Sequence, residues 1–142
     1  MDQAEVKKFT AVSQNDLPAI RQFVEQTAVS LDGTPDAISE LIVSTNEAIT
    51  NILNHGYNHK AGDIEIMVAR QNNHLIIRLR DHAHPFDPTS VPKPDITLPL
   101  EARTPGGLGV HMIREFTDDL TYRTTNDGEN ELIMIKYDAI IK

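Results

Sequence analysis

The chain has 142 residues, of which 39% are hydrophobic and 24% charged, as is typical of one soluble globular domain. Its formal net charge of −8 argues against direct binding to DNA or RNA, and the lack of cysteine excludes disulfides and thiolate metal sites. No apolar run reaches the roughly 20 residues of a membrane span, and the N-terminus does not resemble a signal peptide. We therefore expect a single cytoplasmic domain, residues 1–142, without a membrane partner.

The first part of the chain predicts a short strand and then an amphipathic helix. Residues 6–12 form the candidate strand. Asn15 is a suitable N-cap, and Pro18 falls in the first helical turn, where its missing N–H costs nothing. Apolar residues spaced three and four apart continue to Leu31, so this helix should end at Asp32 and the glycine after it.

A second helix is predicted to begin at Thr34, as N-cap, and Pro35, as first helical residue. We expect it to end near Gly56 in a left-handed conformation. Glu47 and Asn51 lie four residues apart and therefore share one face of this helix. A carboxylate beside a carboxamide is a candidate base-and-metal pair, although the same two residues are ordinary on a solvated helix face.

The second half of the chain predicts two hairpins separated by a loop and a short helix. Alternating apolar residues mark one hairpin over residues 64–80 and another over residues 120–137. Between them lies a proline-rich loop, residues 81–103, and a short amphipathic helix, residues 110–117. Two antiparallel hairpins and helices favour an α+β fold, a two-layer sandwich with a mostly antiparallel sheet and helices on one face.

Two further features could carry chemistry. Gly106, Gly107 and Gly109 precede a helix, where free N–H groups and the helix dipole favour an anion such as phosphate. Alone, such glycines are often only a turn. Asp81 ends a predicted strand, where its carboxylate could accept a hydrogen bond from an exocyclic amine such as that of adenine, or could simply cap the loop.

Three segments, in this order, resemble the GHKL (Bergerat-type) ATPases. Glu47 and Asn51 are similar to the N box, and Asp81 with Phe86 to the D-x-G-x-x-F box. Residues 106–109 are similar to the second glycine box. More closely, the chain resembles the anti-sigma factor serine/threonine-protein kinases, which are stand-alone domains of this type, over roughly residues 16–137. The segments that carry this closer resemblance are residues 46–51, 55–57, 85–88, 99–101 and 106–110.

The resemblance implies a role for three residues around a nucleotide. Asn51 would bind Mg²⁺ through its side-chain oxygen and so hold the ATP phosphates. Glu47 would be the general base that takes the proton from a serine or threonine hydroxyl of a partner protein. Asp81 would bind the adenine amino group, and Phe86 belongs to the same nucleotide site. The cofactors implied are ATP and Mg²⁺.

The same resemblance assigns nucleotide-binding roles to the proline-rich loop and to the glycine segment after it. Gly106, Gly107, Leu108 and Gly109 would wrap the phosphates. The ATP lid would span about residues 88–105, with Arg103 as a candidate contact to the terminal phosphate.

The family also implies partners. Its members bind a sigma factor in one state and phosphorylate an anti-sigma-factor antagonist of the STAS type in the other, and they often form homodimers. A dimer would use the N-terminal strand and the exposed face of the first helix. The alternative is a non-catalytic module of the same fold that sequesters a sigma factor or another regulator. Ala83 favours that alternative, because it stands where the D-x-G box has glycine and would be strained if a left-handed conformation were needed.

The histidines offer a different reading. His55 and His59, with His82 and His84, could form a zinc site. A glycine at position 56 should separate the first pair, and histidines in loops or at helix ends are more often solvated or hydrogen-bonded.

Overall fold

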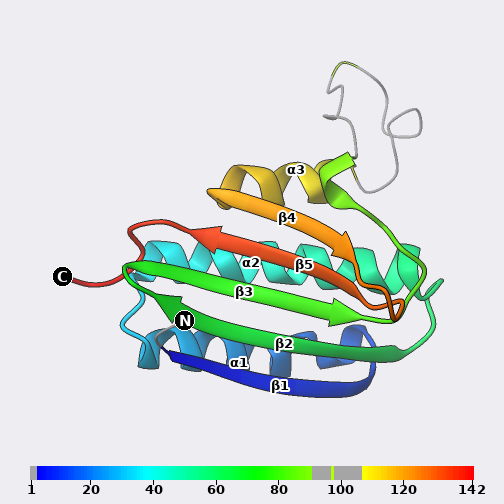
Figure 1. The fold of residues 1–142 in the computed structure, drawn as a ribbon, viewed down its shortest axis with the longest axis horizontal. Helices are drawn as coiled ribbons and strands as arrows, with labels where there is room; N and C mark the ends of the chain where they lie inside the picture. Colours follow the sequence, from blue (N-terminus) through cyan, green and yellow to red (C-terminus); the bar gives the residue numbers. More distant parts are fainter. Residues whose placement is uncertain (1–2, 91–96, 98–106) are drawn as a thin grey trace.

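The structure is a computed structural model that describes residues 3–90, 97 and 107–142. An antiparallel sheet with the strand order β1-β2-β3-β5-β4 forms one of its two layers (Figure 1). The strands are β1 (Gln3–Val12), β2 (Gly62–Gln71), β3 (His74–Asp81), β4 (Asp119–Thr124) and β5 (Asn130–Lys136).

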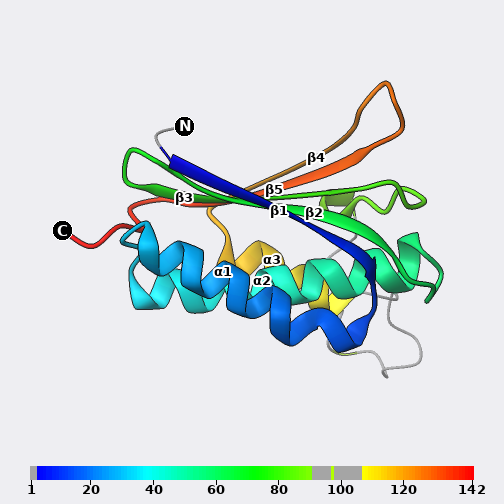
Figure 2. The same cartoon turned by 90° about the horizontal axis from the view of Figure 1, so that it is seen from below.

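The helices form the other layer and cover one face of the sheet (Figure 2). None of the helices in the described part of the chain is both long and apolar enough to span a bilayer. The α-helices are α1 (Leu17–Ser30), α2 (Pro35–Asn51) and α3 (Gly107–Phe116). The short helices are the 3-10 helices η1 (Gln14–Asp16) and η3 (Pro88–Ser90), and the π-helix η2 (Ile52–Gly56). This arrangement confirms the predicted two-layer α+β sandwich.

The beginnings of the first two helices follow from their capping residues. Thr34 caps α2, because its side chain accepts a hydrogen bond from the N–H of Ala37 at 3.3 Å, as predicted. The prediction of Asn15 as N-cap is wrong. Ser13 has the extended backbone of a cap, and it forms a reciprocal capping box with Asp16 that opens η1 instead.

The end of α2 also differs from the prediction. The chain widens into η2, in which the N–H of Tyr57 donates to the carbonyl of Ile52 at 2.8 Å. Gly56 is not left-handed; Asn58 and His59 are, with φ of 56° and 65°. Gly56 is required for packing instead, because a Cβ at this position would lie 2.7 Å from the Cβ of Ala83.

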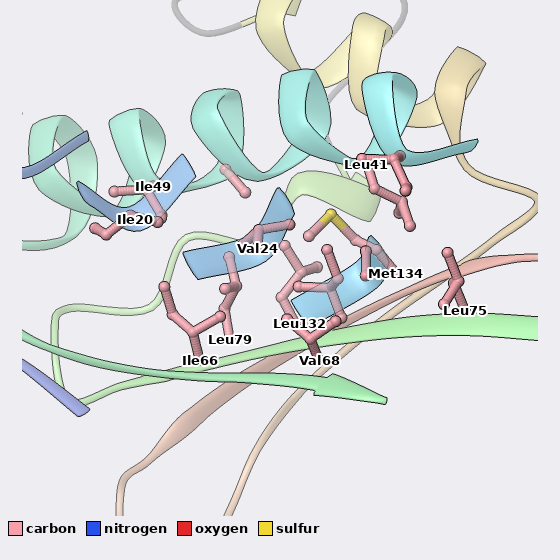
Figure 3. Packing of buried hydrophobic residues seen from close by; sticks show 14 of the residues in the cluster. Ile20, Val24, Leu41, Ile49, Ile66, Val68, Leu75, Leu79, Leu132 and Met134 are labelled. Atoms are coloured by element: carbon pink, nitrogen blue, oxygen red, sulfur yellow. The ribbon is translucent and has the colours of Figure 1, made fainter. Parts of the chain in front are cut away.

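The hydrophobic core fills the space between the helices and the sheet (Figure 3). Val24 of α1 and Ile49 of α2 point toward Ile66 of β2 and Leu79 of β3, and all four side chains are fully buried. The alternating residues of the predicted hairpins therefore place their apolar side toward the helices, as expected. This packing fixes the ends of α2, β3 and β5, where the polar residues gather.

Candidate functional site

A pocket opens between the end of α2, the loop after β3 and the β4–β5 hairpin. Its free volume is about 370 Å³, which includes space open to the solvent at its mouth. Apolar side chains such as Ile113 and Leu132 form much of its wall. Three buried polar residues also line it: Asn51, Asp81 and Asn130. The pocket thus combines an apolar wall with a few hydrogen-bonding groups.

Asn51 stands at the last position of α2 and is only 7% exposed. Its side-chain nitrogen Nδ2 is buried and has no hydrogen-bond partner among the described residues. Buried polar groups are seldom left unpaired in folded proteins. An unpaired amide donor in the wall of a pocket fits an acceptor that arrives with a ligand, such as a phosphate or water oxygen, and the oxygen of the same carboxamide is of the kind that Mg²⁺ prefers.

Glu47 lies one turn before Asn51 and is partly exposed. Its carboxylate packs against α3 at Gly109, where a Cβ would lie 2.6 Å from Oε2 of Glu47. No hydrogen bond or ion pair joins Glu47 to another residue that the structure describes. The missing side chain of Gly109 therefore makes room for a carboxylate that is not committed to a structural partner there.

Asp81 ends β3 and is 7% exposed. Its Oδ1 atom accepts two hydrogen bonds, from the N–H of Ala83 at 2.9 Å and from Nδ2 of Asn130 at 2.9 Å. Burial raises the pKa of the Asp81 carboxyl group, and these two hydrogen bonds oppose that increase. The site therefore holds a buried carboxyl group in a fixed orientation.

Ala83 is buried beside this carboxyl group but is not left-handed, so its side chain causes no backbone strain. Its Cβ fills the space that the missing side chain of Gly56 leaves open. The departure from the D-x-G pattern is thus accommodated by a glycine on the neighbouring helix.

Phe86 lies in the loop after β3 and also lines the pocket. Its ring is stacked on the ring of His55, with the centroids 4.6 Å apart and the planes 16° from parallel. The π-helix η2 carries His55 to this position. The described residues contain no cluster of three or more histidine, aspartate or glutamate side chains placed to share a metal ion, so the four histidines do not assemble a zinc site.

The glycine segment is described only in part. Gly107 begins α3, and Leu108 and Gly109 follow within its first turn, so this helix starts three residues before the predicted Val110. Arg103 and Gly106 lie outside the described residues, as does most of the predicted lid; of residues 88–105, the structure describes the 3-10 helix η3 and residue 97.

Sequence reasoning missed two hydrogen-bonding residues of the pocket wall, Asn130 and Tyr122. Asn130 begins β5 and reaches Asp81, and Tyr122 of β4 donates from its hydroxyl to Oδ1 of Asn130 at 3.2 Å. Asn130 follows a turn of polar residues, and nothing in the local sequence separates it from them. His55 stood within a recognised segment, but its stacking on Phe86 depends on the π-helix.

Comparisons with known proteins agree with this fold. The chain is 27% identical to the serine-protein kinase RsbW of Bacillus thuringiensis (strain Al Hakam), over 85% of this chain and 81% of that protein. It is 28% identical to the serine-protein kinase RsbW of Bacillus anthracis with the same coverage. These relatives confirm the predicted resemblance.

Two solved structures share the fold at low sequence identity. The RsbU and RsbW domains of Rv1364c from Mycobacterium tuberculosis align with a TM-score of 0.65 and 11% identity, over 99% of this chain and 34% of that chain. The SiaB–SiaC complex from Pseudomonas aeruginosa aligns with a TM-score of 0.64 and 15% identity, over 92% and 88%.

The match to a family model extends over residues 10–136, which include both layers of the fold and every described residue of the pocket wall. The chain therefore belongs to the histidine kinase-like ATPase domain family.

Proposed function

We propose that this protein binds ATP with Mg²⁺ in the pocket and transfers the terminal phosphoryl group to a serine or threonine hydroxyl of a partner protein. The observation that carries the proposal is the position of Asn51. Its unpaired buried amide lies in the same pocket as the buried carboxyl group of Asp81, and Glu47 stands one helical turn away. Asp81 would then recognise the base, Asn51 would hold the metal and phosphates, and Glu47 would take the proton.

Asn51 would hold Mg²⁺ through its side-chain oxygen. The metal, when bound, neutralises the charge of the phosphates. Gly107, Leu108 and Gly109 would contribute the N–H groups at the beginning of α3, where the helix dipole favours an anion. Gly106 and Arg103 keep their expected roles as phosphate contacts in this proposal, and residues 88–105 that of a lid.

Glu47 would accept the proton of the attacking hydroxyl group. A general base must reach this hydroxyl directly, and the partial exposure of Glu47 leaves its carboxylate accessible to a side chain of another protein. Because Gly109 has no side chain, the carboxylate can keep its place beside α3.

Asp81 would accept a hydrogen bond from the adenine amino group. Phe86, stacked on His55, would contribute an apolar surface at the same end of the pocket. The ring of Phe86 lines the pocket and could pack against a planar base, with His55 stacked on it as support.

The relatives support the proposed kinase role, because those named above are serine-protein kinases. We propose that this protein, like the family it resembles, binds a sigma factor in one state and phosphorylates a STAS-type anti-sigma-factor antagonist in the other. It would do so as one cytoplasmic ATPase domain, residues 1–142. The non-catalytic alternative rested on strain at Ala83, and that residue has an unstrained backbone.

Transfer from γ-labelled ATP to proteins of a lysate of the native host tests the proposal. Purified wild-type protein should label one partner on serine or threonine. Glu47→Gln should lose this labelling but keep ATP binding, because only the proton acceptor is removed. Asn51→Ala should weaken ATP binding itself. Labelling by Glu47→Gln at the wild-type rate would refute the assignment of the base.

A further inference from the structure

Asn130 has all of its side-chain hydrogen-bonding capacity in use at the pocket wall. It is 2% exposed. Its Nδ2 atom donates to Oδ1 of Asp81 at 2.9 Å and to the carbonyl of Ala83 at 2.8 Å. Its Oδ1 atom accepts from the hydroxyls of Tyr122 at 3.2 Å and Thr124 at 3.1 Å. A reversed amide would place its oxygen against a carboxylate and a carbonyl, so this network allows one orientation.

This arrangement determines what Asp81 offers to a ligand. Both of its hydrogen bonds end on Oδ1, and Oδ2 has no hydrogen-bond partner within the described ranges. Asp81 lines the pocket, so its remaining capacity faces a ligand as an acceptor. Asn130 lines the same pocket but has no donor left for a ligand.

We propose that Asn130 is a positioning residue that holds Asp81 as a pure hydrogen-bond acceptor, so that the pocket selects adenine over guanine. The inference rests on the proposed function, that this pocket binds a nucleotide. Adenine presents an amino group, a donor, where guanine presents a carbonyl, an acceptor. A carboxylate facing the guanine carbonyl would leave two acceptors unpaired, and a site built for a donor rejects such an analogue strongly.

The ionisation of Asp81 supports this role. Burial raises the pKa of its carboxyl group, and the hydrogen bonds from Asn130 and Ala83 lower it, because they stabilise the charged form. Other titratable groups also face it: His82 at the end of the strand, Tyr57 after η2 and Tyr122 on β4. His84 lines the same pocket. Without Asn130, a protonated Asp81 could donate to a guanine carbonyl, and discrimination would relax.

Asn130→Leu removes both donors, and its effect is measured in two ways. The first is an NMR titration of the Asp81 carboxyl carbon in the ligand-free protein, in which the pKa should be higher than in wild type. The second is calorimetric titration with Mg-ATP and Mg-GTP across pH. Wild type should prefer ATP at least about tenfold, and the variant should lose about tenfold of that preference, as for one charge-assisted hydrogen bond. The acidic limit of ATP binding should move to higher pH.

Two further variants guard against a merely structural effect. Tyr122→Phe removes one hydroxyl that orients the Asn130 amide but keeps both amide donors, so it should shift selectivity in the same direction by less. It also serves if Asn130→Leu does not fold. Ile77 is fully buried on β3 and has no hydrogen bond to Asp81. The variant Ile77→Val should therefore lower stability without changing the preference for ATP.

The titrations separate a failure of the proposed role of Asn130 from a failure of nucleotide binding itself. If wild type binds ATP but the Asn130→Leu and Tyr122→Phe variants keep its ATP preference and pH dependence, the role of Asn130 is refuted and the proposed function stands. If wild type binds neither nucleotide, the proposed function fails and base selection fails with it. The NMR titration needs no ligand, and an unchanged Asp81 pKa in Asn130→Leu would refute the coupling by itself.

Discussion

At the scale of single residues, the missing side chain of Gly109 sets the position of the Glu47 carboxylate. A Cβ at Gly109 would lie 2.6 Å from Oε2 of Glu47, which is the mobile end of a flexible side chain. Gly109→Ala should therefore fold and should displace the carboxylate. Phosphoryl transfer should fall about 10- to 100-fold, as misplaced catalytic groups do. Stability should stay equal or rise by up to about 1 kcal/mol, because alanine favours the helix. Labelling rates and thermal unfolding measure both effects.

Met112→Ala provides a control on the same helix, because Met112 is 37% exposed and does not line the pocket. It should transfer phosphate at the wild-type rate. Wild-type transfer by Gly109→Ala would show that Glu47 does not depend on this space.

Gly56 and Ala83 form a second pair in which one residue makes room for the other. Gly56→Ala would bring two Cβ atoms within 2.7 Å on backbones that cannot both yield. We expect a loss of about 1–3 kcal/mol in the free energy of unfolding, as for overpacked cores. Gly56→Ala combined with Ala83→Gly should recover most of it. Denaturant unfolding of the two single variants and the double variant gives the coupling, and strictly additive effects would rule out this contact.

At the scale of elements, the sequence predicts the helix starts and hairpins that depend on residues only a few positions apart. Thr34 and Pro35 locate the start of α2, and period-two alternation locates both hairpins, because caps and periodicity act within a few residues. The π-helix η2 was not predictable in this way. Gly56 looks like a helix stop, but glycine is needed at this position because it packs against Ala83, 27 positions further along the chain.

The residues of the candidate site also fall into two groups, those that local spacing pairs and those that only the fold brings together. Glu47 and Asn51 share a helix face, so their pairing can be read from spacing. The bond between Asn130 and Asp81 joins residues 49 positions apart and requires β3 and β5 to be neighbours in the sheet. That adjacency follows from the strand order, which no local pattern specifies.

The sheet also carries an ion-pair network on the face away from the helices. Glu131 of β5 is 3% exposed and accepts from Nε of Arg80 and Nε of Arg123, each at 2.8 Å. The hydrogen bond from Arg123 is the main cause that lowers the pKa of Glu131 below its ordinary value of 4.5, and the Arg80 hydrogen bond adds to it. This carboxylate therefore stabilises the fold above that pH, and the contribution is lost as pH falls through the lowered pKa.

Glu131→Gln should accordingly lower the free energy of unfolding at neutral pH by about 1–3 kcal/mol, because the buried carboxylate loses the charge that strengthens its hydrogen bonds from the two arginines. The difference from wild type should shrink below about pH 4.5. Urea unfolding at several pH values measures it, with the exposed Glu115→Gln as a control that should change little. A difference that does not vary with pH would refute this role for Glu131.

At the scale of the whole molecule, assembly remains a prediction. The strand β1 lies at the edge of the sheet, and Val6 on it is 54% exposed, as is Val29 on α1 at 58%. We expect a homodimer that uses this strand and helix. Light scattering after gel filtration should give the dimer mass at micromolar concentration, and Val6→Glu with Val29→Glu should weaken it at least about tenfold. Met112→Glu should not, and a wild-type monomer would refute the dimer.

We propose that ATP binds together with Mg²⁺ in the pocket between the end of α2, the loop after β3 and the β4–β5 hairpin. Calorimetric titration of ATP into the wild-type protein, with and without Mg²⁺, tests it most directly. We predict micromolar binding, about −8 kcal/mol, that depends on the metal and is weakened by Asn51→Ala. No binding of ATP in the presence of Mg²⁺ would refute this nucleotide site, and the protein would then hold a regulator without phosphoryl transfer.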